Sequence, residues 1–145
     1  MIKNYLPDWL NKKYEEKEMS SNKREKIADF LDLIQNVWCI SNQDYQNRIW
    51  VQHETQDIVD SFCDTRMYFS EDAEAVLEAY EEGRVKMTDQ QHKMLKKLYE
   101  MVDNYEPQPE IPFEFRRCRD QQIVNDPNWN KIRDFAKLVY EELIK

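Results

Sequence analysis

Apolar residues recur at helical spacing along most of this chain. The clearest run lies between residues 27 and 38, where the apolar positions are Ile27, Phe30, Leu31, Ile34, Val37 and Trp38. A repeat of three or four residues over about three turns is typical of an amphipathic helix. We expect this helix to begin after Asn22, with Glu25 completing a capping pair at its start.

Start and stop signals predict further helices. The first is expected to run from Pro7, a residue suited to the first helical position, to near Lys17. Another opens at the capping box Thr88–Gln91, and the last begins at Asp126–Pro127. Gly83, the single glycine of the sequence, stands where a helix end favours a left-handed residue.

Two regions have a pattern that suits more than one structure. Ser41 with Asp44 can start a helix that carries apolar residues as far as Cys63, but residues 52–57 are entirely polar. Residues 42–66 therefore form either one helix with a solvated middle or two helices with a break. Ser70 is expected to cap a separate short helix after them. Three prolines between residues 107 and 112 exclude a regular helix there, and residues 113–124 are compatible with a short one.

These elements predict an all-α protein, a compact single-domain bundle of five to seven helices over residues 1–145. A chain of 145 residues fits one domain. The single glycine argues against hairpins and sheets, which use glycine in tight turns.

Composition and motifs exclude several classes of site. Three scattered cysteines and two histidines give no metal-ligand spacing, and one glycine cannot build a phosphate loop. We expect no enzyme activity, no catalytic residues, no metal and no cofactor. The N-terminus lacks the apolar run of a signal peptide, and no run approaches a membrane span, so we expect a cytoplasmic protein.

The stretch Glu114–Asp120, reading EFRRCRD, places three arginines around Cys118. Nearby cations can lower the pKa of a thiol and make it reactive. A buried cysteine with outward arginines is the simpler interpretation, because free cysteine is among the most buried residue types. Arg116, Arg117 and Arg119 either bind an anion or pair with acids of the fold, and we expect the pairing.

The negative charge is concentrated in one segment. Residues 54–82 contain ten acids and one base, Arg66, whereas the other residues contain 20 bases and 19 acids. The acids are spaced as on helices, with Ile58, Val59 and Phe62 expected on the opposite, buried face. Such a stripe is either a solvated face or a docking surface for a basic protein. A surface of this charge disfavours direct binding of nucleic acid or anionic membranes.

The docking interpretation predicts the partner-binding residues. They are Asp57, Asp60, Asp64, Tyr68, Glu71, Asp72, Glu74, Glu78, Glu81 and Glu82. Tyr68 and Phe69 are expected between two acidic helices, where they either belong to the core or serve as exposed anchors.

A small, acidic, all-helical chain without a catalytic motif resembles bacterial immunity proteins, including those of contact-dependent inhibition and related polymorphic toxin systems. The resemblance rests on size, on fold class and on the acidic residues 54–82, with some similarity of character in residues 113–129. It implies a protein that binds and neutralises a cognate basic toxin domain, expected to be a nuclease. The alternatives are an adaptor or regulatory subunit of a cytosolic complex, and a small enzyme that uses Cys118 or a helical acid/base pair.

Overall fold

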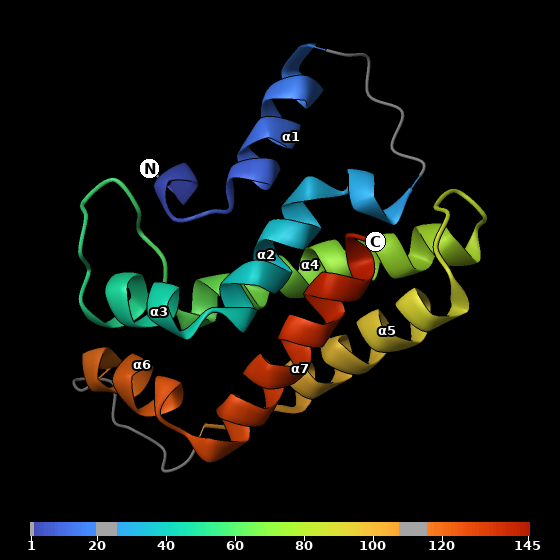
Figure 1. Ribbon diagram of the computed structural model, residues 1–145. Helices are drawn as coiled ribbons and strands as arrows, with labels where there is room; N and C mark the ends of the chain where they lie inside the picture. Colours follow the sequence, from blue (N-terminus) through green and yellow to red (C-terminus); the bar gives the residue numbers. More distant parts are fainter. Residues whose placement is uncertain (1, 20–25, 108–115) are drawn as a thin grey trace.

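The computed structural model describes residues 2–19, 26–107 and 116–145, and the side chains of all of these except 17–19 and 116–119. The described residues form an all-α bundle, as the sequence predicts (Figure 1). Its α-helices are α1 (Asp8–Met19), α2 (Leu31–Ser41), α3 (Gln43–Tyr45), α4 (Phe62–Glu81), α5 (Asp89–Asn104), α6 (Arg116–Val124) and α7 (Pro127–Leu143). Shorter turns are the 3-10 helices η1 (Ile2–Asn4) and η2 (Ile27–Asp29) and the π-helix η3 (Gln46–Val51). None of the helices in these ranges has the length and apolar character needed to cross a membrane.

Four helices form the centre of the bundle. α7 packs against α2 and α5, and α4 packs against the same two helices, so each of the four has two neighbours. α1 lies against α2 on the outside, and α6 packs against η3 and α7 (Figure 1). The inward faces supply fully buried side chains, including Ile34, Val37, Phe69, Leu98 and Ala136. This burial of apolar surface is the main force that holds the helices together.

An aromatic cluster fixes the start of α4. The ring of Phe62 lies edge-on to Trp129 of α7 with centroids 5.2 Å apart, and edge-on to Trp50 of η3 at 6.2 Å. Tyr105 contacts both Phe62 and Trp129. Edge-to-face pairs at these distances are favourable beyond the area they bury. The first residue of α4 is therefore held by two other elements.

The π-helix is secured by one buried glutamine. The side-chain Nε2 of Gln46 donates to the carbonyl oxygens of Cys39 and Ile40, at 2.8 and 2.7 Å. Its Oε1 accepts from Trp129 Nε1 at 3.1 Å and from Arg133 Nη1 at 3.3 Å. A buried amide needs its partners, and here all the interactions cross between elements. Gln46 thus joins η3 to the end of α2 and to α7.

The local helix signals are confirmed. Thr88 Oγ1 accepts from the Gln91 backbone N–H and Gln91 Oε1 accepts from the Thr88 N–H, which is a capping box. Asp126 Oδ1 accepts from the N–H of Asn128 at the start of α7. Gly83 follows α4 with φ of 76°. Each signal depends on residues only a few positions apart, which explains why the sequence predicts it.

The helix expected to start after Asn22 begins instead at Leu31; residues 20–25, including Asn22 and Glu25, lie outside the described residues. Ile27–Asp29 forms a 3-10 turn, and Phe30, with φ of −85° and ψ of 72°, separates that turn from α2. The backbone N–H of Ile27 donates to the carbonyl of Lys86 at 3.0 Å. A long-range contact therefore competes with continuation of the helical pattern.

Of the two alternatives for residues 42–66, the structure has two helical segments with a break, and the break extends beyond the polar residues 52–57. Helical backbone ends at Val51, residues 52–61 are irregular, and α4 starts at Phe62. His53 has a positive φ of 48°, which a continuous helix does not permit. Ser61 caps α4 by accepting from the Asp64 N–H at 3.2 Å. The separate helix expected from Ser70 is wrong, since Ser70 lies inside α4.

Candidate partner-binding surface

The predicted partner-binding residues divide between α4 and the irregular segment before it. Asp64, Tyr68, Glu71, Asp72, Glu74, Glu78 and Glu81 lie on α4, and Glu82 follows it. Asp57 and Asp60 belong to residues 52–61, which we call loop 52–61. The expected helical row of Asp57, Asp60 and Asp64 is therefore wrong, because only Asp64 is helical.

Five glutamates form one exposed acidic face on α4 and its C-terminal end: Glu71, Glu74, Glu78, Glu81 and Glu82. Glu71 and Glu78 are seven residues apart and share a side of the helix, as do Glu74 and Glu81. Repulsion between like charges one turn apart costs a few tenths of a kcal/mol per pair.

Some of these acids have partners inside the protein. Glu82 forms an ion pair with Arg84 at 2.5 Å, and Glu74 accepts a hydrogen bond from the hydroxyl of Tyr99 on α5. That bond raises the pKa of Tyr99 to about 12. Across residues 2–19, 26–107 and 116–145, no ion pair is formed by Glu71, Glu78 or Glu81.

Asp60 has a structural role that its spacing does not reveal. Its Oδ2 accepts from the Tyr45 hydroxyl at 2.6 Å and from Trp50 Nε1 at 3.2 Å. The Thr65 hydroxyl donates to the same carboxylate at 2.9 Å, and the Ser61 N–H donates to Oδ1 at the same distance. Asp60 therefore points into the fold and ties loop 52–61 to η3 and α4.

Burial raises the pKa of Asp60 above its usual range, while hydrogen bonds from Tyr45, Thr65 and Trp50 act in the opposite direction. Desolvation disfavours a charge, and hydrogen bonds to the charged form favour it. The net direction shows that burial is the stronger effect here.

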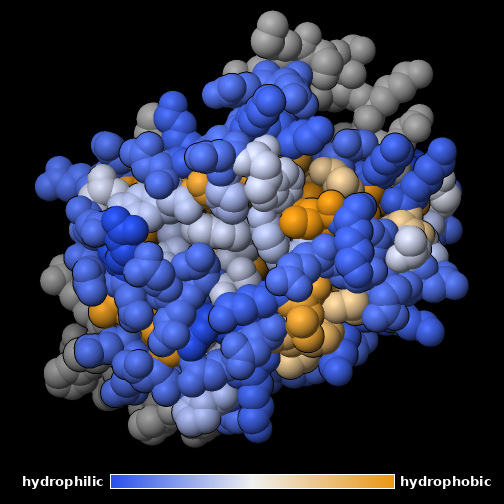
Figure 2. All heavy atoms as spheres, viewed as in Figure 1, coloured by the Kyte–Doolittle hydropathy of each residue, from blue (hydrophilic) through white to orange (hydrophobic). Residues whose placement is uncertain are grey.

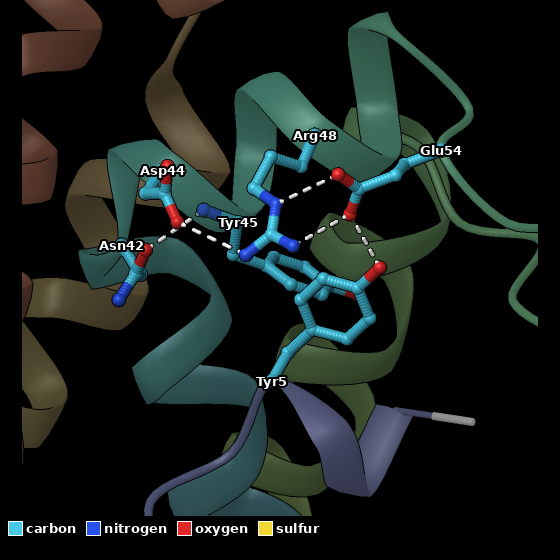
Figure 3. Close-up of polar contacts among 6 residues, drawn as sticks. All are labelled: Tyr5, Asn42, Asp44, Tyr45, Arg48 and Glu54. Atoms are coloured by element: carbon cyan, nitrogen blue, oxygen red, sulfur yellow. Dashed lines mark hydrogen bonds and ion pairs between the residues drawn. The ribbon is translucent and has the colours of Figure 1, made fainter.

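The other end of loop 52–61 is held by Glu54 (Figure 3). Arg48 donates to Glu54 through Nε at 3.1 Å and through Nη2 at 2.9 Å, a two-point contact. The Tyr5 hydroxyl donates to Glu54 Oε2 at 2.6 Å, and the Arg48 guanidinium lies 4.8 Å from the centroid of the Tyr5 ring. Hydrogen bonds from Tyr5 and Arg48 lower the pKa of Glu54. Glu54 is thus paired inside the protein as well.

A groove opens beside the Asp60 end of loop 52–61. It has a volume of about 400 Å³ and lies between α2, loop 52–61 and α4. Its lining residues include Gln35, Asn36 and Cys39 of α2, Ile58, Val59 and Asp60 of the loop, and Thr65 and Tyr68 of α4. Burial raises the pKa of the Cys39 thiol, which makes Cys39 an unreactive wall residue.

Apolar and aromatic side chains are exposed beside the groove. Val59 is 89% exposed and Tyr68 is 52% exposed, and Met67 next to Tyr68 is 46% exposed. Val59 was expected to be buried on a helix, but it belongs to the irregular residues 52–61, where the helical spacing of apolar residues does not apply. Phe69 belongs to the core, whereas Tyr68 faces solvent, although both were expected between two helices. Exposed aromatic and apolar residues grouped in this way are typical of binding surfaces.

Figure 2 shows one side of the bundle, the one seen in Figure 1, where α4 passes behind α2 and α7. Hydrophilic residues cover most of this side, and apolar residues form small separate areas.

Two features of the sequence remain, the scattered metal-ligand residue types and the stretch EFRRCRD. Within the described residues, no three histidine, cysteine or acidic side chains are placed to hold a metal ion. His92 stacks on Tyr80 with ring centroids 4.4 Å apart. The side chains of Arg116, Arg117, Cys118 and Arg119 lie outside the described residues, so the internal pairing of these arginines stays a prediction.

No protein-family model, curated protein or solved structure matches this chain. The argument for function therefore depends on the geometry of the groove and of the acidic face.

Proposed function

We propose that the protein binds a basic partner protein and neutralises it, acting as an immunity protein against a toxin domain, expected to be a nuclease. The observation that carries the proposal is the position of the groove. It opens beside the N-terminal half of α4, the same helix that carries the acidic face. Helix α4 thus contributes both to the groove and to the acidic face.

The acidic face and the apolar residues at the groove have separate roles in this proposal. Charges of one sign speed the encounter with an oppositely charged partner and repel wrong ones. Exposed aromatic and apolar residues supply the binding energy once contact is made, and tyrosine is enriched among such anchors. Glu71 and Glu78 would pair with basic residues of the partner, while Tyr68 and Val59 would be covered by its surface.

A toxin that acts on nucleic acid needs a basic cleft, because phosphate contacts dominate its affinity for substrate. A helix of 20 residues is about 30 Å long and can lie along such a cleft. Carboxylates would then occupy positions that phosphates occupy in the substrate, and the toxin would be blocked.

The test begins with capture of binding proteins from the native host at low salt. The supporting result is a single basic protein that is released at high salt and is toxic when expressed alone. Its affinity for the purified chain is then measured by calorimetry. The E71K/E78K double variant should lower this affinity about tenfold or more. The control E100K/E141K reverses two exposed acids on α5 and α7 and should have little effect.

Equal losses in the two double variants would mean that net charge alone governs binding, and the acidic face would lose its role. Partners that are not toxic alone would favour an adaptor function instead.

A further inference from the structure

The groove contains the half-buried carboxylate of Asp60. In the described part of the chain, no lysine or arginine forms an ion pair with Asp60. Its four donors, the side chains of Tyr45, Trp50 and Thr65 and the backbone N–H of Ser61, are all neutral. Carboxylates removed from water are usually paired with a cation.

The groove is also accessible from solvent and mostly apolar. Ile58, Val59 and Tyr68 line it, and the exposed Val59 and Tyr68 stand at its edge. Gln35 and Asn36 add side-chain amides in the wall formed by α2, and amide oxygens can accept hydrogen bonds from a cation. A ligand that suits these walls has an apolar stem, a flat cationic head and several donors.

We propose that the groove receives the side chain of one arginine from the basic partner, with its stem against Ile58 and Val59 and its guanidinium between Tyr68 and the carboxylate of Asp60. This inference rests on the proposed function, because it names the partner residue that the same surface recognises.

Arginine fits this groove better than lysine. A guanidinium is flat, is more weakly hydrated than an ammonium group and stacks on aromatic rings, so it loses less on entering an apolar site. It also carries five donors in a fixed plane, which can reach the amides of Gln35 and Asn36. The neutral donors already occupy the lone pairs of Asp60, so Asp60 acts on the guanidinium through its charge.

The test uses small probes and the ¹⁵N-labelled full chain. Nα-acetyl-arginine amide is titrated at constant ionic strength while amide chemical shifts are followed by NMR. A ligand of this size in an open groove should have a dissociation constant on the order of 1 mM. We expect saturating shifts in residues 35–39, 57–61 and 65–68, and none along the acidic face.

Two further probes identify the chemistry. The citrulline analogue has nearly the same shape without the charge and should bind at least about fivefold more weakly. The lysine analogue keeps the charge without the planar head and should also bind several-fold more weakly. Equal binding of citrulline would overturn the electrostatic part, and equal binding of lysine would overturn the choice of arginine. The absence of saturating shifts up to about 20 mM arginine probe would overturn the whole inference.

A pair of variants locates the site. V59K changes a side chain that is 89% exposed, so the fold should be retained, and it places a competing cation at the groove. It should weaken binding of the arginine probe at least about fivefold. E100K makes a charge change on α5 away from the groove and should alter binding less than about twofold. Equal effects of the two variants would show unspecific attraction to a negative surface.

The arginine-groove inference and the proposed function can fail independently of each other. A toxic basic partner that is bound by the chain, together with failure of the arginine probe, would reject the groove inference alone. Binding of the probe without any basic partner in the host would reject the proposed function and leave an arginine site that serves another protein.

Discussion

Replacement of Asp60 by asparagine tests how loop 52–61 is held against the bundle. The substitution keeps the size and shape of the side chain and removes its charge. The carboxylate accepts from four donors at 2.6–3.2 Å, of which Trp50 is almost fully buried. An amide has one acceptor oxygen with two lone pairs, so it can satisfy only two of these donors.

The expected loss of stability follows from this comparison. A buried donor left without an acceptor costs about 1–3 kcal/mol. The hydroxyls of Tyr45 and Thr65 can rotate and accept from the new Nδ2, which offsets part of that cost. Asparagine also removes the desolvation cost of the ionised Asp60. We therefore expect D60N to lower the free energy of unfolding by about 1–2 kcal/mol near neutral pH.

The pH dependence has a definite sign. Burial raises the pKa of Asp60 in the folded protein above its ordinary value of 3.8. A raised folded pKa contributes stability that is fully present below the unfolded pKa and is lost as the pH rises through the folded value. The stability difference between the wild-type protein and D60N should therefore be larger in acid and should shrink as the pH rises from about 4.

Urea unfolding followed by tryptophan fluorescence measures this difference at each pH. E78Q is the matched control, because it neutralises an exposed acid on α4 and should change stability by less than about 0.5 kcal/mol. A stability difference between the wild-type protein and D60N that grows with rising pH would show that hydrogen bonds outweigh burial in setting the pKa of Asp60. A loss as small as that of E78Q would show that Asp60 is not an anchor.

Three other substitutions have expected outcomes that urea unfolding can check. G83A should cost about 1 kcal/mol from backbone strain alone, because φ is 76° and a Cβ would meet no atom within 4 Å; no loss would mean that the turn relaxes. Glu54 has a pKa lowered mainly by hydrogen bonds from Tyr5 and Arg48, so its stabilising effect is present above the unfolded pKa and is lost as the pH falls through the folded value. The difference in free energy of unfolding between the wild-type protein and E54Q should accordingly grow with rising pH. A difference that does not change with pH would contradict the pairing of Glu54 with Tyr5 and Arg48. Q46L leaves the Trp129 indole N–H and two carbonyls without partners and should cost about 3 kcal/mol or more; a loss under about 1 kcal/mol would show that water replaces the amide.

The fold class and several helix ends follow from local sequence, whereas the boundaries of loop 52–61 do not. The Thr88 capping box and Gly83 act through neighbouring residues and were predictable. Residues 52–57 gave two possible structures because their polar pattern suits either. Contacts of Glu54 with Arg48 and of Asp60 with Tyr45 favour the break, and the second pair is separated by 15 residues.

The candidate site also combines features that local sequence predicts with features that it does not predict. The exposed glutamates of α4 were predictable from helical spacing, because a helix that buries one side exposes the other. The exposure of Val59 was not, since the helical pattern was continued into residues 52–61, which are irregular in the structure. The groove itself combines α2, loop 52–61 and α4, and only the tertiary fold brings them together.

The positions of these acids in the structure decide which of them can be replaced to test function without disturbing the fold. Asp60 and Glu54 hold loop 52–61 in place, so lysine at either position would disturb the groove by breaking its walls. A charge-reversal set that included Asp60 would confuse partial unfolding with loss of binding. Glu71 and Glu78 are exposed on α4 and form no ion pair within the described residues, so their reversal changes the surface potential and leaves the packing unchanged. The acidic segment therefore has two parts, a structural one before α4 and an exposed one along α4, and only substitutions in the second test the proposed function without changing the fold.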